Sequence, residues 1–383
     1  MDIICISTTD WDEIWGSRQQ IMSCLADEGH RILFIERQVG PEHLLRDHSM
    51  RVRKLNAWKQ SALRSPVKNI YLWQPPLLFP GRYYSTIFNR FGQSILFQRL
   101  KPILRQLNIQ HPVLWLYPPH SAPLIGRFLE IISVYHCIER FIGGQSGIKR
   151  AVMEKQELAL LKKVDLVFTH AEGLQRLYQP YTKRPIMILP SAADVQRFQS
   201  ISSIHPDVQK IPQPRLGVVC TLDGRIDVDL LLGVATQQPD WHLVIIGPVR
   251  PGRINLDEFF SLPNVHYLGL RPFSDLPGYL NGIDVCLIPY VRNELTEYIS
   301  PIKLFEYLAV GKPIVSVDLP EVKLLSQFIL TAHNTPEFII AVQNALAENS
   351  TTLQAARRKV AWEHTWETRA KQAWSEIAKV LNE

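Results

Sequence analysis

The stretch SPIKLFEYLAVGKPIVS, residues 300–316, decides the fold because it contains a complete helix-to-strand unit. Ser300 and Pro301 are typical of a helix cap and a first helical position, and Gly311 is typical of the residue that ends a helix. The short apolar run after Gly311 predicts a buried strand. Units of this kind build parallel sheets that are covered by helices on both faces.

The same alternation runs along the whole chain. Strand-like apolar runs in the first half are DIICIS, RILFIE, VLWLYP, ISVYHCI, DLVFTH and IMILPS, and those in the second half are LGVVC, HLVIIG, VHYLG, DVCLIPY and PIVSV. The helical patterns between them include SRQQIMSCLADEG, IKRAVMEKQELALLKK, DVDLLLGVA and PIKLFEYLAVG. Right-handed crossovers then predict an α/β protein with two doubly wound, Rossmann-like domains.

The expected boundary is SISSIHPDVQKIPQP, residues 200–214, which is rich in Ser and Pro. It gives an N-terminal domain over residues 1–200 and a C-terminal domain over 201–361. A helical tail from about Thr352 to Leu381 carries three tryptophans, so we expect residues from about 362 to 383 to cross back to the first domain. Two such domains place a ligand cleft at the carboxyl ends of their strands.

Composition narrows the class of protein. The 383 residues are 46% hydrophobic and 20% charged, which excludes a disordered or fibrous chain. Five scattered cysteines without a CxxC pair argue against a disulfide framework or zinc site and favour a reducing compartment. The start MDIICISTTDWDE does not read as a signal peptide, and no apolar run approaches the roughly 20 residues of a membrane span. We therefore expect a cytoplasmic protein, or one held at the inner membrane surface.

Charge is concentrated in one segment. From Arg46 to Arg105 there are twelve basic residues and one acid, a net +11 against +6 for the whole chain. Residues 74–104 of this segment mix Arg and Lys with Leu, Ile, Phe and Tyr, which favours an interfacial surface facing anionic lipid. A solvated basic face over an apolar core is the alternative. Because no nucleic-acid-binding motif accompanies the charge, we expect no nucleic-acid partner.

Lys303 and Glu306 lie in the first turns of the helix that Pro301 begins. A cation there is unfavourable for the helix dipole, so the pair is either a surface ion pair or a ligand site. The backbone amides from Ile302 onward and Lys303 suit a phosphate, and Glu306 suits sugar hydroxyls. No metal is expected, because DVD at 227–229 lies at a predicted helix start and reads as a cap.

The segment YISPIKLFEYLAVGKPIVSVDLPEV, residues 298–322, resembles the donor-site signature of group 1 glycosyltransferases of the GT-B fold. The resemblance continues in VDLVFTHAEGLQRLY, in IMILPSAADVQRF with Asp194, in VVCTLDGRIDVDLLLGVATQQPDWHLVIIGPV, and in NVHYLGLRPFSDLPGYLNGIDVCLIPY. It implies that the second domain holds a nucleoside diphosphate sugar as donor substrate, with no other cofactor, and that the first domain binds the acceptor.

The resemblance also implies roles for individual residues. Glu306 matches the ribose-binding glutamate, Arg225 the arginine of the GR loop, and Lys303 a lysine that contacts the diphosphate. Arg271 and Pro272 lie in the loop that flanks the base, and Ser300 and Ile302 lie at the phosphate-binding helix start. Tyr290 ends a strand and is expected either to contact the sugar or base or to be an interior aromatic.

Three positions depart from the family pattern. Tyr298 replaces a glutamate that contacts the donor sugar, Asp227 follows in the GR loop where a lysine is frequent, and Ser191 replaces an asparagine. These departures resemble the branch that builds exopolysaccharides, teichuronic acids and other envelope glycans, some of whose members invert the anomeric carbon. They leave retention and inversion both open.

An inverting transfer needs a base for the acceptor hydroxyl. VYHCIERF, residues 134–141, follows a first-domain strand, and Glu139 falls on an acidic position of the related sequences. Glu139 is our first candidate, against a structural pairing with an arginine, and His136 is the second. Gly16 and Arg18, at the start of the first helix, are candidates for an anionic acceptor or the donor phosphate.

The sequence thus predicts a metal-independent glycosyltransferase that moves a sugar to a glycan or lipid-linked saccharide in polysaccharide biosynthesis. Two alternatives remain at this point. One is a nucleotide-sugar epimerase or hydrolase on the same scaffold, and the other is a non-catalytic sugar-nucleotide-binding scaffold at the membrane.

Overall fold

The computed structural model describes residues 1–41, 50–52, 54–55, 63–77, 80–250, 256–348 and 350–382. The chain divides into two compact units, one of Met1–Pro190 with Arg369–Glu383 and one of Ser191–Thr368. The sequence placed these boundaries at 200/201 and near 361/362. The first boundary falls earlier because helix α7 (Val195–Ser200) packs against α11 and α12 of the second unit.

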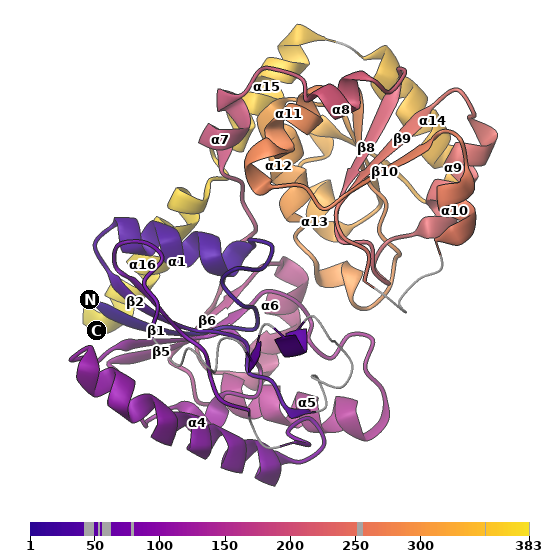
Figure 1. Ribbon diagram of the computed structural model, residues 1–383. Coiled ribbons are helices and arrows are strands. Elements are labelled where there is room, and N and C mark those ends of the chain that lie inside the picture. The colour runs from indigo at the N-terminus through magenta and orange to yellow at the C-terminus, as the bar shows by residue number, and fades with distance from the viewer. Residues whose placement is uncertain are drawn as a thin grey trace. The chain divides into compact units, whose positions relative to one another are not determined.

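The first unit contains a seven-stranded parallel sheet in the order β3-β2-β1-β4-β5-β6-β7. Its strands are β1 (Asp2–Ile6), β2 (Arg31–Ile35), β3 (Ile70–Trp73), β4 (Val113–Leu116), β5 (Ile132–Cys137), β6 (Leu166–Thr169) and β7 (Ile186–Ile188). Its helices are α1 (Ser17–Asp27), α4 (Thr86–Gln106), α5 (Gly147–Leu161), α6 (Glu172–Tyr178) and most of α16 (Trp366–Asn382). Figure 1 shows α1 and α16 on one side of this sheet and α4 on the other.

The second unit contains a six-stranded parallel sheet in the order β10-β9-β8-β11-β12-β13. Its strands are β8 (Arg215–Val219), β9 (His242–Ile246), β10 (Val265–Gly269), β11 (Val285–Ile288), β12 (Ile314–Val317) and β13 (Ile329–Ala332). Its other helices are α8 (Pro206–Gln209), α9 (Val228–Gln237), α10 (Asp257–Ser261), α11 (Leu276–Asn281), α12 (Ile302–Val310), α13 (Pro320–Lys323), α14 (Thr335–Ala347) and α15 (Thr351–Ala361). Helices α9, α10 and α14 lie on one side of the sheet, and α11, α12 and α15 lie on the other (Figure 1).

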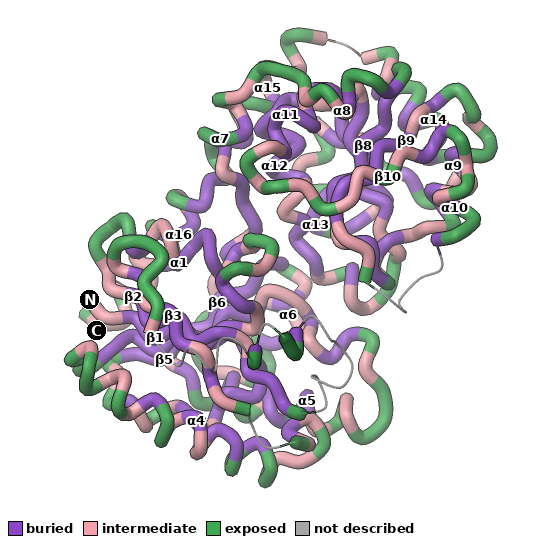
Figure 2. Tube along the Cα trace, viewed as in Figure 1, coloured by how far each residue is buried: buried purple, intermediate pink, exposed green. Residues whose placement is uncertain are grey.

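Both sheets reverse their strand order, between β1 and β4 in the first and between β8 and β11 in the second. The strands on either side of each reversal are buried, as the purple tube of Figure 2 shows. Helices on both faces explain why these strands read as continuous apolar runs in the sequence. The predicted doubly wound α/β fold is therefore confirmed, and so is the return of the C-terminal helix to the first unit. Ligands bind beside such reversals, at the carboxyl ends of the strands.

Three local details differ from the sequence prediction. The outer strands β3 and β13 were not predicted, and the helical tail is two helices because the chain turns between Ala361 and Trp366. Thr365 caps the second of them, since its Oγ1 accepts a hydrogen bond from the Thr368 amide at 3.1 Å. Helix α12 begins one residue later than expected, with Pro301 as its cap. Gly311 ends α12 in the left-handed conformation, at φ 77°, as predicted.

Candidate functional site

The start of α12 is held by a contact within the second unit. Ser300 does not cap the helix; its Oγ accepts a hydrogen bond from the Ser191 amide at 3.2 Å, and its carbonyl accepts one from Ser191 Oγ at 2.7 Å. Pro301 offers no side-chain acceptor to the first amides of the helix, Ile302 among them. An uncapped helix start of this kind suits an anion.

Lys303 and Glu306 are brought together on α12, as the sequence predicted. Lys303 Nζ lies 2.6 Å from Glu306 Oε2. The Glu306 side chain is 3% exposed and that of Lys303 is 22% exposed. Burial raises the pKa of Glu306, and the charge and hydrogen bond of Lys303 lower it, with a net pKa above the ordinary value. Lys303 is therefore the member of the ion pair that remains open to solvent.

The loop after β8 carries a second charged group, which the sequence analysis overlooked. The buried Asp223 accepts hydrogen bonds from Arg225 Nε and Nη2, both at 2.9 Å, and lies 3.5 Å from Arg250 Nη1. Burial raises the pKa of Asp223, but the hydrogen bonds and charge of Arg225 with the charge of Arg250 outweigh it, so the pKa is lowered. Asp223 thus fixes the guanidinium of Arg225. The signal in the sequence was the acid two residues before the predicted arginine.

The loops after β8 and β11 are tied to each other. The Val291 amide donates to the Arg225 carbonyl, and the Asp227 amide donates to the Pro289 carbonyl, each at 2.8 Å. Burial raises the pKa of Tyr290 to about 12, and the charges of Arg225 and Glu306 also act on it. Tyr290 is bridged to Ile226, the residue after Arg225. These residues converge beside β8 and β11, where the strand order reverses.

Arg271 and Pro272 lie after β10, in the predicted loop. Arg271 Nη2 is 3.2 Å from Asp207 Oδ2, and its guanidinium lies over the ring of Tyr279 at 5.7 Å from the centroid. Pro272 is exposed and precedes a short 3-10 turn, Phe273–Asp275. Arg271 is thus engaged by α8 and α11 in this structure, and its contact with a base stays a prediction.

In the first unit, the structure places His136, the second candidate base, in the interior. Its imidazole is completely buried, stacked on Tyr117 with ring centroids 5.0 Å apart and edge-on to His170 at 5.1 Å. Burial lowers the pKa of His136 well below its usual value, and the charges of His170 and Arg18 lower it further. The residue lies inside because β5 runs through a sheet that is covered on both faces. It does not face solvent, where an acceptor hydroxyl would approach.

Glu139 lies two residues beyond β5 and is partly exposed. Its negative charge acts on Arg18 in the first turn of α1. Burial lowers the pKa of Arg18, and the charge of Glu139 is the largest of the causes that raise it. Arg18 lies over the ring of Tyr117 at 5.6 Å from the centroid, and its buried Nε has no hydrogen-bond partner within the described ranges. Gly16, the cap of α1, donates its amide to Gln19 at 3.2 Å. Arg18, which lies over Tyr117 just after β4, is thus near the strand-order reversal of the first sheet.

The described residues contain no group of three or more His, Cys, Asp or Glu side chains that could hold a metal ion. They also contain no helix that is long and apolar enough to cross a membrane.

Comparisons with known proteins give a family-model match and a curated relative. Residues 214–348 match the family model "Glycosyl transferases group 1". The chain is 27% identical over 308 residues to the putative teichuronic acid biosynthesis glycosyltransferase TuaH of Bacillus subtilis, covering 75% of this chain and 76% of that protein.

Solved structures share the fold over the whole chain. Sucrose-phosphate synthase of Thermosynechococcus elongatus superposes with a TM-score of 0.75 at 16% identity, over 100% of this chain and 99% of the other. HepE of Anabaena, solved with UDP and glucose, superposes with a TM-score of 0.67 at 12% identity, over 99% of each chain.

Proposed function

We propose that this chain is a glycosyltransferase that transfers a sugar from a nucleoside diphosphate sugar to a glycan or lipid-linked saccharide. The match of residues 214–348 to the group 1 family model, the relative TuaH and the GT-B fold of the solved structures support this proposal. The observation that carries the proposal is the ion pair between the half-buried Lys303 and the buried Glu306 at the uncapped start of α12. An anionic ligand there meets both the helix start and a lysine, which is the arrangement that binds phosphate.

The proposed donor is a UDP-sugar, since the structural relative HepE was solved with UDP and glucose. The diphosphate binds the first amides of α12 with Lys303, and Arg225 adds a second cation from the loop after β8. These groups stabilise the diphosphate as it leaves, without a metal ion. Glu306 accepts hydrogen bonds from the two ribose hydroxyls when Lys303 turns to the phosphate.

The donor site is tested with Lys303→Ala and Glu306→Ala. Each variant should lose at least about a hundredfold in kcat/KM for the donor, because each removes a charged contact to the diphosphate or ribose. Lys359→Ala, which changes an exposed lysine of α15 in the same unit, is the matched control and should keep wild-type turnover. Wild-type turnover in either site variant, with the fold intact, would contradict the proposal.

For the acceptor side, the proposed base is Glu139, which is partly exposed beside Arg18. In an inverting transfer its carboxylate takes the proton of the attacking hydroxyl. Glu139→Gln should then reduce kcat at least about a hundredfold while the Kd for UDP stays unchanged, since proton transfer is removed but the second unit is untouched. A Glu139→Gln enzyme with wild-type kcat would reject this role, and a retained anomeric configuration in the product would do the same.

A lipid-linked acceptor implies work at a membrane surface, and the first half of α4 suits such a surface. Its outer side exposes large apolar residues: Ile87 is 75% exposed, Phe91 54% and the neighbouring Tyr84 59%. Arg90 and Arg99 are exposed on the same helix, whereas Leu96 and Leu100 are buried in the first unit. Several basic residues of the segment 46–105, including Arg46, lie outside the described residues. We therefore place the proposed anionic lipid contact at α4.

Sedimentation with vesicles tests this contact. The protein should bind phosphatidylglycerol vesicles at low salt, bind less at high salt, and bind phosphatidylcholine vesicles weakly. Changing Ile87 and Phe91 together to Ser should weaken binding, because these side chains would no longer enter the interface. The matched control is Ile340→Ser, which removes an exposed apolar side chain from α14 of the second unit. Absence of binding to anionic vesicles at low salt would refute the contact.

A further inference from the structure

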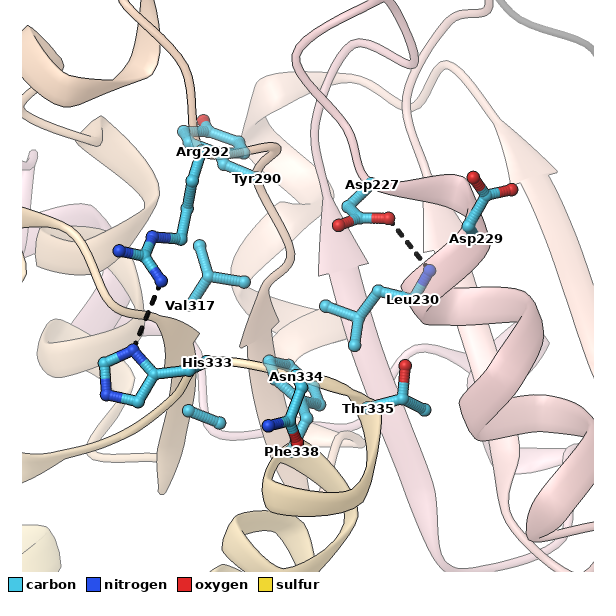
Figure 3. A pocket seen from close by; sticks show the side chains of 11 residues that line it. Asp227, Asp229, Leu230, Tyr290, Arg292, Val317, His333, Asn334, Thr335 and Phe338 are labelled. Carbon is cyan, nitrogen blue, oxygen red and sulfur yellow. Dashed lines mark hydrogen bonds between the residues drawn. The ribbon is translucent and has the colours of Figure 1, made fainter.

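A pocket of about 420 Å³ lies in the second unit, outside the group around α12. The ends of β11, β12 and β13 and the first turns of α9 and α14 form its walls (Figure 3). Of the residues discussed above, Asp227 and Tyr290 line it, and Lys303, Glu306 and Arg225 do not. The volume is in the range of small-molecule sites, about 300–1,000 Å³.

The two sides of the pocket carry opposite charges that are not paired with each other. Arg292 Nη1 is hydrogen-bonded to His333 Nδ1 at 3.2 Å, and this His333 nitrogen also lies 3.6 Å from Asp318 Oδ2. Within the described ranges Arg292 itself forms no ion pair with an acid. Across the pocket, Asp227 Oδ1 accepts the Leu230 amide at 2.9 Å, and Asp227 has no basic partner in the described part of the chain. Figure 3 shows Arg292 and His333 on one side and Asp227 and Leu230 on the other.

The helix starts that border the pocket are already capped. Asn334 Oδ1 accepts the Glu337 amide at 2.9 Å, and Glu337 Oε2 accepts the His333 amide at 2.9 Å. Asp227 caps α9 in the same way. Binding capacity therefore rests on side chains, which include the guanidinium of Arg292, the second carboxylate oxygen of Asp227 and the carboxylate of Asp229. Leu230, Val317 and Phe338 add an apolar surface between them.

We propose that this pocket is a second carbohydrate site, which binds an anionic monosaccharide: a sugar ring that carries a carboxylate or a phosphate. Arg292 takes the anionic group through two parallel N–H donors, and Asp227 accepts hydrogen bonds from ring hydroxyls. The C–H face of the ring packs on the apolar surface. A ligand with an anion at one end and hydroxyls at the other satisfies both unpaired charges at once. The site does not depend on the transfer reaction.

The test is titration calorimetry with the full chain, with and without saturating UDP, so that a failure of the donor site does not obscure the result. The probes are glucuronate, glucose 6-phosphate, glucose and inorganic phosphate. We expect glucuronate, glucose 6-phosphate or both to bind at least about tenfold more tightly than glucose and phosphate, with no competition from UDP. Which of the two binds identifies the anionic group.

Two variants locate the site. Arg292→Gln should weaken the anionic sugar about tenfold or more, and Asp227→Asn should weaken it while still capping α9, because asparagine is an equally good cap. Lys359→Gln changes an exposed charge elsewhere in the unit and should leave the affinity unchanged. The proposal is overturned if no anionic sugar binds, if glucose or phosphate binds equally well, if UDP displaces the sugar, or if Arg292→Gln binds like the wild type.

Discussion

At the scale of single residues, Lys303 and Glu306 show how one ion pair can serve two ligand groups. The pair is closed at 2.6 Å, so a ligand has to replace it rather than fill an empty space. Glu306 alone would be a buried carboxylate, and its raised pKa reflects that cost. The charge and hydrogen bond of Lys303 offset the cost of burying the Glu306 carboxylate until Lys303 binds phosphate. The two readings that the sequence left open, an ion pair or a ligand site, are thus compatible.

This division of roles gives a prediction about nucleotide selectivity. Lys303→Met should reduce the preference for UDP over UMP, because the Lys303 contact to the diphosphate is lost while those of Arg225 and the α12 amides remain. Glu306→Gln should keep the preference for UDP over UMP but should bind UDP and 2′-deoxy-UDP nearly equally. Competition binding with these three nucleotides measures both effects. Equal losses for all ligands in both variants would mean that the pair acts only through the fold.

At Gly247, directly after β9, the backbone passes very close to that of Cys220, directly after β8. Its φ is +139°, and a Cβ there would lie 1.8 Å from the Cys220 carbonyl oxygen. Gly247→Ala should therefore lower the free energy of unfolding by about 3 kcal/mol or more, since left-handed strain adds to overpacking. Gly224→Ala is the control, because nothing lies within 4 Å of its Cβ position, and it should change stability by less than about 0.5 kcal/mol. Urea unfolding of the two variants provides the comparison.

At the scale of elements, helix α16 is part of the first unit although it ends the chain. Ala370, Ala373 and Ile377 are completely buried, and Trp374 lies against His30 with ring centroids 3.8 Å apart. The sequence predicted a docked tail from its three tryptophans, of which Trp374 makes this contact. The break before α16 was not visible, because Trp362–Thr365 contains neither Gly nor Pro.

Because α16 packs on the first unit, truncating one of its buried side chains should lower the free energy of unfolding. Ile377→Ala should lower the free energy of unfolding by about 2–4 kcal/mol, because it leaves a cavity under the helix. Ile340→Ala on α14 removes the same atoms from a side chain that is exposed, and should change stability by less than about 0.5 kcal/mol. Thermal and urea unfolding of the two variants distinguish these outcomes. Equal effects would show that α16 is not packed as described.

At the scale of the whole molecule, the sequence predicted most strands of the two sheets, because a strand buried on both faces is a continuous apolar run. Central strands such as β4 and β8 are continuous apolar runs and were found. Of the four outer strands, β7 and β10 were found and β3 and β13 were missed. The sequence also did not show which side chains from distant segments contact a given residue. Nothing near Arg271 indicates that Asp207 engages it, and nothing near His136 indicates that Tyr117 and His170 enclose it. The charged residues at the start of α12, by contrast, could be predicted to interact, because they lie only three positions apart on one helix.

The buried histidines of the first unit make its stability depend on pH. Burial lowers the pKa of His170 to about 3, and the charges of Arg18 and Arg369 also lower it. In the unfolded chain the same imidazole titrates near pH 6.5, so between these values the unfolded state binds the extra proton. Stability should therefore fall as the pH drops below about 6.5, and the loss should be complete near pH 3.

Replacing His170 measures how much this residue contributes to the pH dependence of stability. His170→Gln cannot take up a proton, so between pH 7 and pH 5 the variant should lose about 2 kcal/mol less stability than the wild type. Contributions from other groups, including the raised pKa values of Glu157 and Glu306, are common to both proteins and cancel in this difference. Urea unfolding of both proteins at the two pH values measures it. If the two proteins lose the same stability between pH 7 and pH 5, His170 is not held neutral inside the fold.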